Sequence, residues 1–181
     1  PLANAKGQTL TILQHNVFCK KLWGDSVRIS QVLLNLLSNA VKYTPEGGNI
    51  CLSVSMNQPF PQSRIHVVFS VEDDGIGIEE EFLRTIFEPF TRETDRIQEN
   101  IQGTGLGMAI TKNLIDLMGG HISIKTTPDM GSTFSIELNL RDTKWALTGS
   151  SALGSEGNAD LEIPPDALPI VAVSGYPEDD E

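Results

Sequence analysis

The amino-acid sequence predicts one domain of mixed helix and strand content, in the α/β (α+β) class. The first observation is a stretch over 28–44 in which apolar residues recur every three or four positions, as on one face of a helix. The second is two strand pairs with alternating apolar and polar residues, 50–56 with 65–71 and 122–124 with 134–140. The third is composition, because 39% apolar residues in a chain of 181 suffice for one core.

The N-terminal part is expected to contain a polar lead-in and two strands. Residues 1–8 are short and polar, and we expect them to fray. Residues 9–13 alternate enough for a strand, and residues 17–23 fit a second, irregular strand. The turn over 24–26 contains Asp and Ser, which cap the helix that follows.

The helix expected over 28–44 has an unusual polar face. Its apolar face consists of Ile29, Val32, Leu33, Leu36, Leu37 and Ala40, and its opposite face of Arg28, Gln31, Asn35, Asn39 and Lys42. Asn is a poor helix former, so two of them on adjacent turns need a reason. Carboxamides offer neutral oxygens to a hard cation and N–H groups to phosphate, and Lys42 adds a positive charge. The alternative is an ordinary solvated helix face.

Two hairpins are expected in the remainder, separated by helices. Residues 50–56 and 65–71 form the first hairpin around a Pro-containing loop, with one face buried. The second pair is joined by a turn at Pro128–Gly131.

Between the hairpins we expect a short helix over 79–87, a mobile loop over 89–105 and a helix over 106–118 that ends at Gly119 and Gly120. The inward face of this last helix is predicted to be Leu106, Ala109, Ile110, Leu114 and Leu117.

Charge and composition differ between the main part of the chain and its C-terminal segment. Eight acidic residues and no Lys or Arg follow Lys144, so residues 1–144 carry only −3 of the net charge of −11. We expect a domain over 9–144 and a disordered acidic tail, rich in Gly, Ser and Pro, over 145–181, with a strand-like piece at 168–176 that is similar to an inner strand of a receiver domain. The mildly acidic domain has no basic face for nucleic acid.

The cysteines and termini indicate a cytoplasmic protein. Cys19 and Cys51 lack metal-site spacing and are expected to be buried or half-buried thiols rather than a disulfide. No signal peptide or membrane-length apolar run is present. Because the chain starts at Pro1, we expect it to be part of a longer protein with a possible upstream anchor.

Three glycine clusters and one acid are the remaining candidates for chemistry. The clusters are Asp73-x-Gly75-x-Gly77, Gly103–Gly107 and Gly131–Thr133. The second opens a helix, where backbone N–H groups and the helix dipole favour an anion, although glycines also build ordinary turns. Asp73 follows a buried strand and is placed to accept a hydrogen bond from an amine, or simply to begin a turn. Walker, Rossmann and Ser/Thr-kinase signatures are absent.

Five motifs in order resemble the ATP-binding catalytic domain of sensor histidine kinases, within the GHKL (Bergerat-fold) ATPases. They are Asn35-Leu-Leu-Ser-Asn39-Ala-Val-Lys42-Tyr43-Thr44, Asp73-Asp-Gly75-Ile-Gly77-Ile78, Phe87-Glu-Pro89-Phe90, Gly103-Thr104-Gly105-Leu106-Gly107 and Gly131-Ser-Thr133-Phe134. The similarity covers about Thr9 to Arg141. It implies a two-layer α/β sandwich, a mixed and mostly antiparallel sheet under about three helices, with ATP between the Asn35 helix and the 89–105 lid.

The resemblance also implies roles for individual residues. Asp73 is expected to take the adenine amine, with Gly75, Gly77, Ile78, Phe90 and Thr133 around the base. Asn39, with Asn35, is expected to ligate Mg2+, and Lys42, Tyr43 and Arg92 to contact phosphate or nucleotide. Gly103, Thr104, Gly105, Leu106 and Gly107 are expected to wrap the phosphates. Asn35, Lys42 and Arg92 are the catalytic candidates.

Some features depart from the family pattern or are absent. Gln102 and Asp129 stand where Gly is common, and Met108 where Leu is usual. None of His15, His66 and His121 has the acidic neighbour of a phosphoacceptor. The partners implied are therefore a separate helical dimerisation and acceptor domain and a response-regulator receiver. The fragment is expected to be a monomer within a homodimeric two-component kinase.

Two other function classes remain open at this point. A GHKL clamp ATPase places a Glu general base where Asn35 stands, and Asn does not deprotonate water, so fast hydrolysis is not expected. A non-catalytic nucleotide-binding regulatory module is the other alternative.

Overall fold

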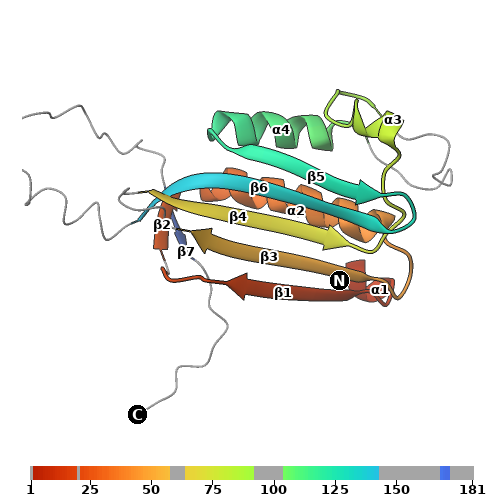
Figure 1. Ribbon diagram of the computed structural model, residues 1–181, viewed down its shortest axis with the longest axis horizontal. Helices are drawn as coiled ribbons and strands as arrows, with labels where there is room; N and C mark the ends of the chain where they lie inside the picture. Colours follow the sequence, from red (N-terminus) through yellow and green to blue (C-terminus); the bar gives the residue numbers. More distant parts are fainter. Residues whose placement is uncertain (1, 20, 58–63, 92–103, 143–167, 172–181) are drawn as a thin grey trace, which may run out of the picture.

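A mixed sheet with helices against one face is the architecture of this chain in a computed structural model, which describes residues 2–19, 21–57, 64–91, 104–142 and 168–171 (Figure 1). Its elements are α1 (Leu2–Ala5), β1 (Thr9–His15), β2 (Lys21–Gly24), α2 (Ser26–Tyr43), β3 (Asn49–Asn57), β4 (Arg64–Asp73), α3 (Glu80–Leu83), α4 (Gly107–Leu117), β5 (His121–Thr127), β6 (Gly131–Asp142) and β7 (Leu168–Val171). Figure 1 shows α2 behind the strands, with α3 and α4 beside β5.

The strand order is β1-β3-β4-β6-β2-β7, with β5 also paired to β6. The β1–β3 pair is parallel and the other pairs are antiparallel. The predicted α/β sandwich with a mixed, mostly antiparallel sheet is therefore confirmed.

Helix α2 forms where the periodicity predicts it. The Asp25 side chain caps it by accepting a hydrogen bond from the Arg28 backbone N–H at 2.9 Å. Its apolar face is at most 5% exposed and consists of Ile29, Val32, Leu36 and Ala40. These residues pack with the helix-facing residues of the strands, among them Ile50, Ile65, Val67, Val71, Ile136 and Leu138, into one core. The flank of α2 that carries Asn35 and Asn39 faces α4.

The structure departs from the sequence expectation at the lead-in. Residues 2–5 form α1, and Gln8 is 6% exposed rather than frayed. The Lys6 ammonium donates to the carbonyls of Val41 at 2.8 Å and Thr44 at 2.6 Å. The last carbonyls of a helix lack partners within the helix, so a residue far away in sequence can satisfy them.

Three other elements differ from their predicted extents. β2 begins at Lys21 instead of residue 17. The helix expected over 79–87 is only Glu80–Leu83, because the chain continues in tighter turns such as Glu88 N–H to Thr85 O at 2.8 Å. Part of the tail expected to be disordered forms β7, which pairs with β2.

The inward face predicted for α4 is partly wrong. Ile110 and Leu117 are 44% and 70% exposed, whereas Thr111 and Ile115 are at most 1% exposed. The apolar periodicity misleads here because a polar residue occupies a buried position. What Thr111 contacts is described below.

Cys19 is buried and Cys51 half-buried, and neither is joined in a disulfide, as predicted. Within the described ranges, no helix has the length and apolar character needed to cross a bilayer.

Candidate functional site

A pocket of about 280 Å3 lies between α2, the start of α4, the segment after α3 and the ends of β4 and β6. Ten of the predicted site residues line it: Asn35, Asn39, Lys42, Tyr43, Asp73, Gly77, Ile78, Thr104, Gly105 and Gly107. They come from three separate stretches of sequence, 35–43, 73–78 and 104–107, which the fold brings together.

Asp73 occupies the deep end of the pocket. It is the last residue of β4 and is 8% exposed. Burial raises the pKa of its carboxyl above the usual value, and hydrogen bonds from the backbone of Gly75 and Ser132 partly oppose that rise. The Gly75 N–H donates to Asp73 Oδ1 at 3.0 Å. The carboxylate is thus held in place by main chain.

The neighbouring Asp74 has a different role. It is exposed and accepts hydrogen bonds from the Asn49 backbone N–H at 2.7 Å and side chain at 2.8 Å. These bonds lower its pKa. Asp74 therefore secures the turn, and Asp73 is the acid that faces the pocket.

The Gly75–Ile78 loop packs tightly on the β5–β6 turn. A Cβ at Gly77, whose φ is +65°, would collide with the Thr127 carbonyl. The Ile76 carbonyl accepts from the Asp129 N–H at 2.8 Å, and Asp129 itself has a φ of +60°. That backbone conformation favours glycine, which is the residue that the family resemblance implies at this position. Gly77 and Ile78 of this loop line the pocket together with Asp73.

The opposite end of the pocket is built from amides. The Asn35 Nδ2 donates to Thr111 Oγ1 at 2.9 Å, and the Asn39 Nδ2 lies 3.4 Å from Met108 Sδ. Both partners belong to α4. The polar flank of α2 is therefore not an ordinary solvated face.

Lys42 and Tyr43 form a contact pair at the end of α2. The Lys42 ammonium donates to the Tyr43 hydroxyl at 3.0 Å and lies 4.7 Å from the centre of its ring. Both side chains line the pocket beside Asn39. They supply a positive charge at the edge of the amide end.

The two ends of the predicted lid are joined to each other. The Phe90 N–H donates to the Gly105 carbonyl at 3.0 Å, and both residues have positive φ values, +65° and +69°. Helix α4 starts two residues later, and among the described residues no side-chain hydrogen bond caps it at Leu106, its N-cap residue. Its N–H groups are available to an anion.

Several predicted residues are not in the pocket lining. Gly75 lies behind Asp73, where a Cβ would be 2.6 Å from Asp73 Oδ1. Phe90 is 74% exposed, and Leu106 is the N-cap residue of α4. Arg92 and Gly103 lie outside the described residues.

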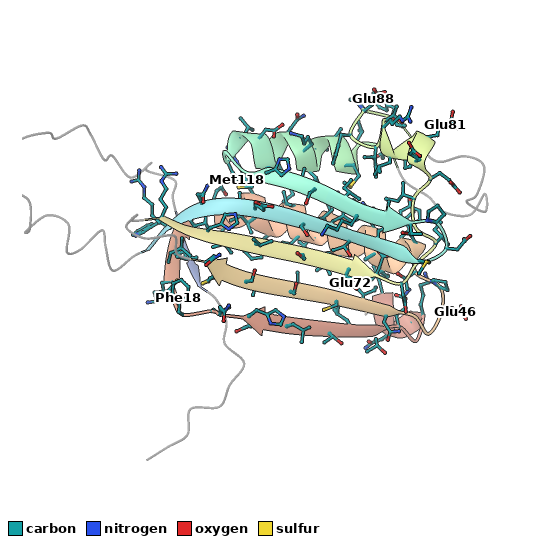
Figure 2. All side chains as sticks on the ribbon, in the orientation of Figure 1. Phe18, Glu46, Glu72, Glu81, Glu88 and Met118 are labelled. Carbon is teal, nitrogen blue, oxygen red and sulfur yellow. The ribbon has the colours of Figure 1, made fainter. Side chains whose placement is uncertain are left out.

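Thr133 is misplaced by the sequence prediction. In the register of β4 and β6, Ser132 lies opposite Asp73 and Thr133 opposite Glu72. Adjacent strand residues point to opposite faces, so Thr133 lies on the face of exposed Glu72, which Figure 2 labels. Ser132 and Phe134 line the pocket instead.

The sequence analysis did not predict a small network of hydroxyl groups beside Asp73. Thr126 Oγ1 accepts from the Ile78 N–H at 2.9 Å and lies 3.0 Å from Ser132 Oγ. Thr111 was also missed. The available signal was a hydroxyl residue at a position of otherwise apolar periodicity.

The donor set suits magnesium bound together with phosphate. Among the described residues there is no group of three or more His, Cys, Asp or Glu side chains fit to hold a metal ion. A cation here depends on the amide oxygens of Asn35 and Asn39 and on oxygens of its ligand. Mg2+ is bound in this manner, with few protein ligands and several waters.

The family comparison agrees with this geometry. The family described as histidine kinase-, DNA gyrase B-, and HSP90-like ATPase matches residues 24–142. The sensor histidine kinase GacS of Pseudomonas protegens is 37% identical over 157 residues, which are 85% of this chain and 17% of GacS. The autoinducer 2 sensor kinase/phosphatase LuxQ of Vibrio parahaemolyticus is 36% identical over 81% of this chain and 17% of LuxQ. The chain thus spans about a sixth of these relatives.

Solved structures show the same fold. The nucleotide-free catalytic domain of histidine kinase ThkA is 29% identical with a TM-score of 0.60, over 76% of this chain and 83% of that one. Full-length ShkA, solved in complex with AMPPNP, is 30% identical with a TM-score of 0.63, over 79% of this chain and 28% of ShkA. The chain therefore belongs to the family of histidine kinase-, DNA gyrase B- and HSP90-like ATPases and contains the ATP-binding catalytic module of a sensor histidine kinase.

Proposed function

We propose that this module binds Mg2+ and ATP in the pocket described above and donates the γ-phosphoryl group to a histidine outside this chain. The observation that supports this most strongly is the convergence of one buried acid, two helical amides and an uncapped helix start on a single pocket. We assign the domain to 9–144, with 1–8 as lead-in and the acidic segment 145–181 as tail.

Asp73 selects the base. Its carboxylate accepts a hydrogen bond from an exocyclic amine, which adenine carries at the six-position and guanine does not. Gly77 and Ile78 border the space for the ring, Gly75 holds the carboxylate through its N–H, and Ser132 adds a hydroxyl beside it. The base end thus favours ATP and ADP over GTP.

The amide end holds the triphosphate. Asn39 and Asn35 are the residues that would hold Mg2+, which neutralises phosphate charge when bound. Lys42 and, from outside the described residues, Arg92 supply positive charge. Gly103, Thr104, Gly105, Leu106 and Gly107 present main chain to the phosphates at the start of α4, while Tyr43 and Phe90 border the nucleotide.

The transfer step needs a second domain. An imidazole nitrogen of the acceptor histidine forms a bond to the γ-phosphorus, and the bond to the bridging oxygen breaks. ADP leaves with that electron pair, and the imidazole proton passes to solvent. We propose a helical dimerisation and acceptor domain as this partner, a receiver as the next acceptor, a homodimeric full-length kinase, and a cytoplasmic location where ATP is available.

Calorimetry and a phosphorylation assay test this proposal. We expect this chain to bind Mg-ATP and Mg-ADP and to bind GTP much more weakly. Mixing it with an acceptor domain and γ-labelled ATP is expected to yield acid-labile phosphohistidine. Tight ATP binding without label transfer to any tested acceptor domain would favour a non-catalytic nucleotide-binding module.

Steady-state hydrolysis distinguishes the clamp ATPases. Asn35 has no basic atom to activate water, so we expect slow ATP turnover by the isolated chain. Rapid turnover would support a clamp-type ATPase instead.

A further inference from the structure

Thr111 is a buried polar residue whose position is explained by a contact with α2. It lies in the second turn of α4 and is 1% exposed. Its Oγ1 accepts a hydrogen bond from Asn35 Nδ2 at 2.9 Å. An amide carries its nitrogen and oxygen on opposite sides, so this bond determines which side of Asn35 presents the oxygen.

Met108 makes the equivalent contact with the second amide. Its Sδ lies 3.4 Å from Asn39 Nδ2 and 3.9 Å from Asn35 Nδ2. A thioether is a weak acceptor and offers no donor, so it prefers the NH2 side of an amide to the oxygen side. Thr111 and Met108 therefore both contact NH2 groups of the α2 amides, while the Asn35 oxygen lies towards Gly107 at the start of the helix.

Gly107 closes the remaining space. A Cβ at this position would lie 2.5 Å from Asn35 Oδ1 and 3.1 Å from Asn35 Nδ2. Asn35 thus fits against bare main chain, and its side chain has little freedom to rotate. Contacts from the first two turns of α4 thus hold the amides of α2.

We infer that Thr111 and Met108 are positioning residues, which orient the Asn35 and Asn39 amides so that their oxygens face the bound metal. The inference rests on the proposed function, because it assigns the two amide oxygens to Mg2+. It gives α4 a second role beyond presenting its N-terminus to phosphate. It also accounts for a polar residue in the core-facing side of α4.

The test compares nucleotide binding with and without metal in Thr111→Val, which is nearly isosteric and lacks the hydroxyl. Calorimetry with a non-hydrolysable ATP analogue measures binding in excess Mg2+ and in EDTA. We expect the affinity in Mg2+ to fall about fivefold, as for a lost neutral hydrogen bond. The affinity in EDTA is expected to stay unchanged, and Thr111→Ser is expected to restore the wild-type value.

Thr44→Val is the matched control. Thr44 is equally buried at 1% exposed, but among the described residues its Oγ1 has no hydrogen-bond partner. We expect this variant to keep the wild-type response to Mg2+. Met108→Leu, which removes the sulfur and keeps the bulk, is expected to weaken Mg2+-dependent binding by about twofold, since the thioether is a weak acceptor.

The outcomes separate the inference from the proposed function. If wild-type protein binds the analogue equally with and without Mg2+, the proposed Mg2+ site is wrong, and the proposed function is contradicted together with the inference. If wild-type binding depends on Mg2+ but Thr111→Val binds like wild type, the positioning role is wrong. An equal loss in Mg2+ and in EDTA, or a loss that Thr111→Ser does not restore, indicates a purely structural role and also overturns it. Thermal unfolding of each variant verifies that the domain folds.

Discussion

The two ends of the pocket are constructed differently. At the base end, Asp73 and Ser132 lie opposite each other on adjacent strands and are held by main-chain hydrogen bonds. At the phosphate end, Asn35 and Asn39 depend on side chains of a second helix, α4. Sheet register is a rigid constraint, whereas the packing of one helix on another tolerates small displacements. We therefore expect the base-binding end to be preformed in the absence of nucleotide. We expect phosphate binding to depend on how α4 packs against α2.

The largest effect is expected from Asp73→Asn at the base end. The substitution removes a buried negative acceptor, and hydrogen bonds to charged groups are worth enough for a loss of about 10- to 100-fold in ATP affinity. Calorimetry with Mg-ATP measures it. Asp74→Asn is the matched control, because Asp74 is exposed and bonded to Asn49, and we expect its affinity to be near that of wild type. Equal losses in both variants would contradict the separate roles assigned to the two acids.

Gly107→Ala tests the phosphate end. Its Cβ would approach Asn35 Oδ1 to 2.5 Å, so the amide has to move away from its present position. We expect about a tenfold loss of Mg2+-dependent affinity, comparable to one lost charge-assisted contact. Binding in EDTA should change much less, and a variant that retains full Mg2+ dependence would show that the amide position is not critical.

Ser132→Ala and Thr133→Ala test the register at the base end. The Ser132 hydroxyl lines the pocket next to Asp73, and Thr133 lies on the other face of β6. We expect Ser132→Ala to weaken ADP binding about three- to fivefold, as for one neutral hydrogen bond. Thr133→Ala should bind normally. The reverse result would restore the sequence-based assignment and contradict the strand register.

The smallest effect is the pH dependence of folding stability that Asp73 causes. Its pKa is raised above the usual 3.8 in the folded protein, so the folded state binds this proton more tightly than the unfolded chain. The associated stability is present below pH 3.8 and is lost as pH rises through the raised pKa. Urea unfolding of wild type and Asp73→Asn over this range measures it. We expect the difference to shift in favour of Asp73→Asn as pH increases, and a shift in the opposite sense would indicate a lowered pKa.

The sequence correctly predicts the helices and strands that have a clear apolar periodicity. Its predictions are wrong where contacts between residues far apart in the chain determine burial or local conformation. Helix α2 and the strands β3, β4 and β6 are recovered because each carries its own apolar pattern. The α4 face is partly wrong because Thr111 is buried by its bond to Asn35, a residue on another helix. The expectation that the N-terminal lead-in frays is wrong, because Lys6 finds its partners at the end of α2.

The candidate site shows the same division. The residue types at Asn35, Asn39, Lys42 and Asp73 were identified from local chemistry and from the family motifs, and the pocket contains all four. The sequence analysis places Thr133 in the pocket, where the structure has Ser132, because a motif does not specify strand register and a shift of one residue exchanges the two faces.

Local patterns in the amino-acid sequence are enough to specify the order of helices and strands, the family and the types of side chain proposed to contact the nucleotide. This is because periodicity and motif chemistry are local properties of the chain. The folded chain is needed to establish which hydroxyl lies beside Asp73, which way the Asn amides are turned and how the N-terminal segment is attached. These depend on register and on contacts between residues far apart in sequence, which no local pattern encodes.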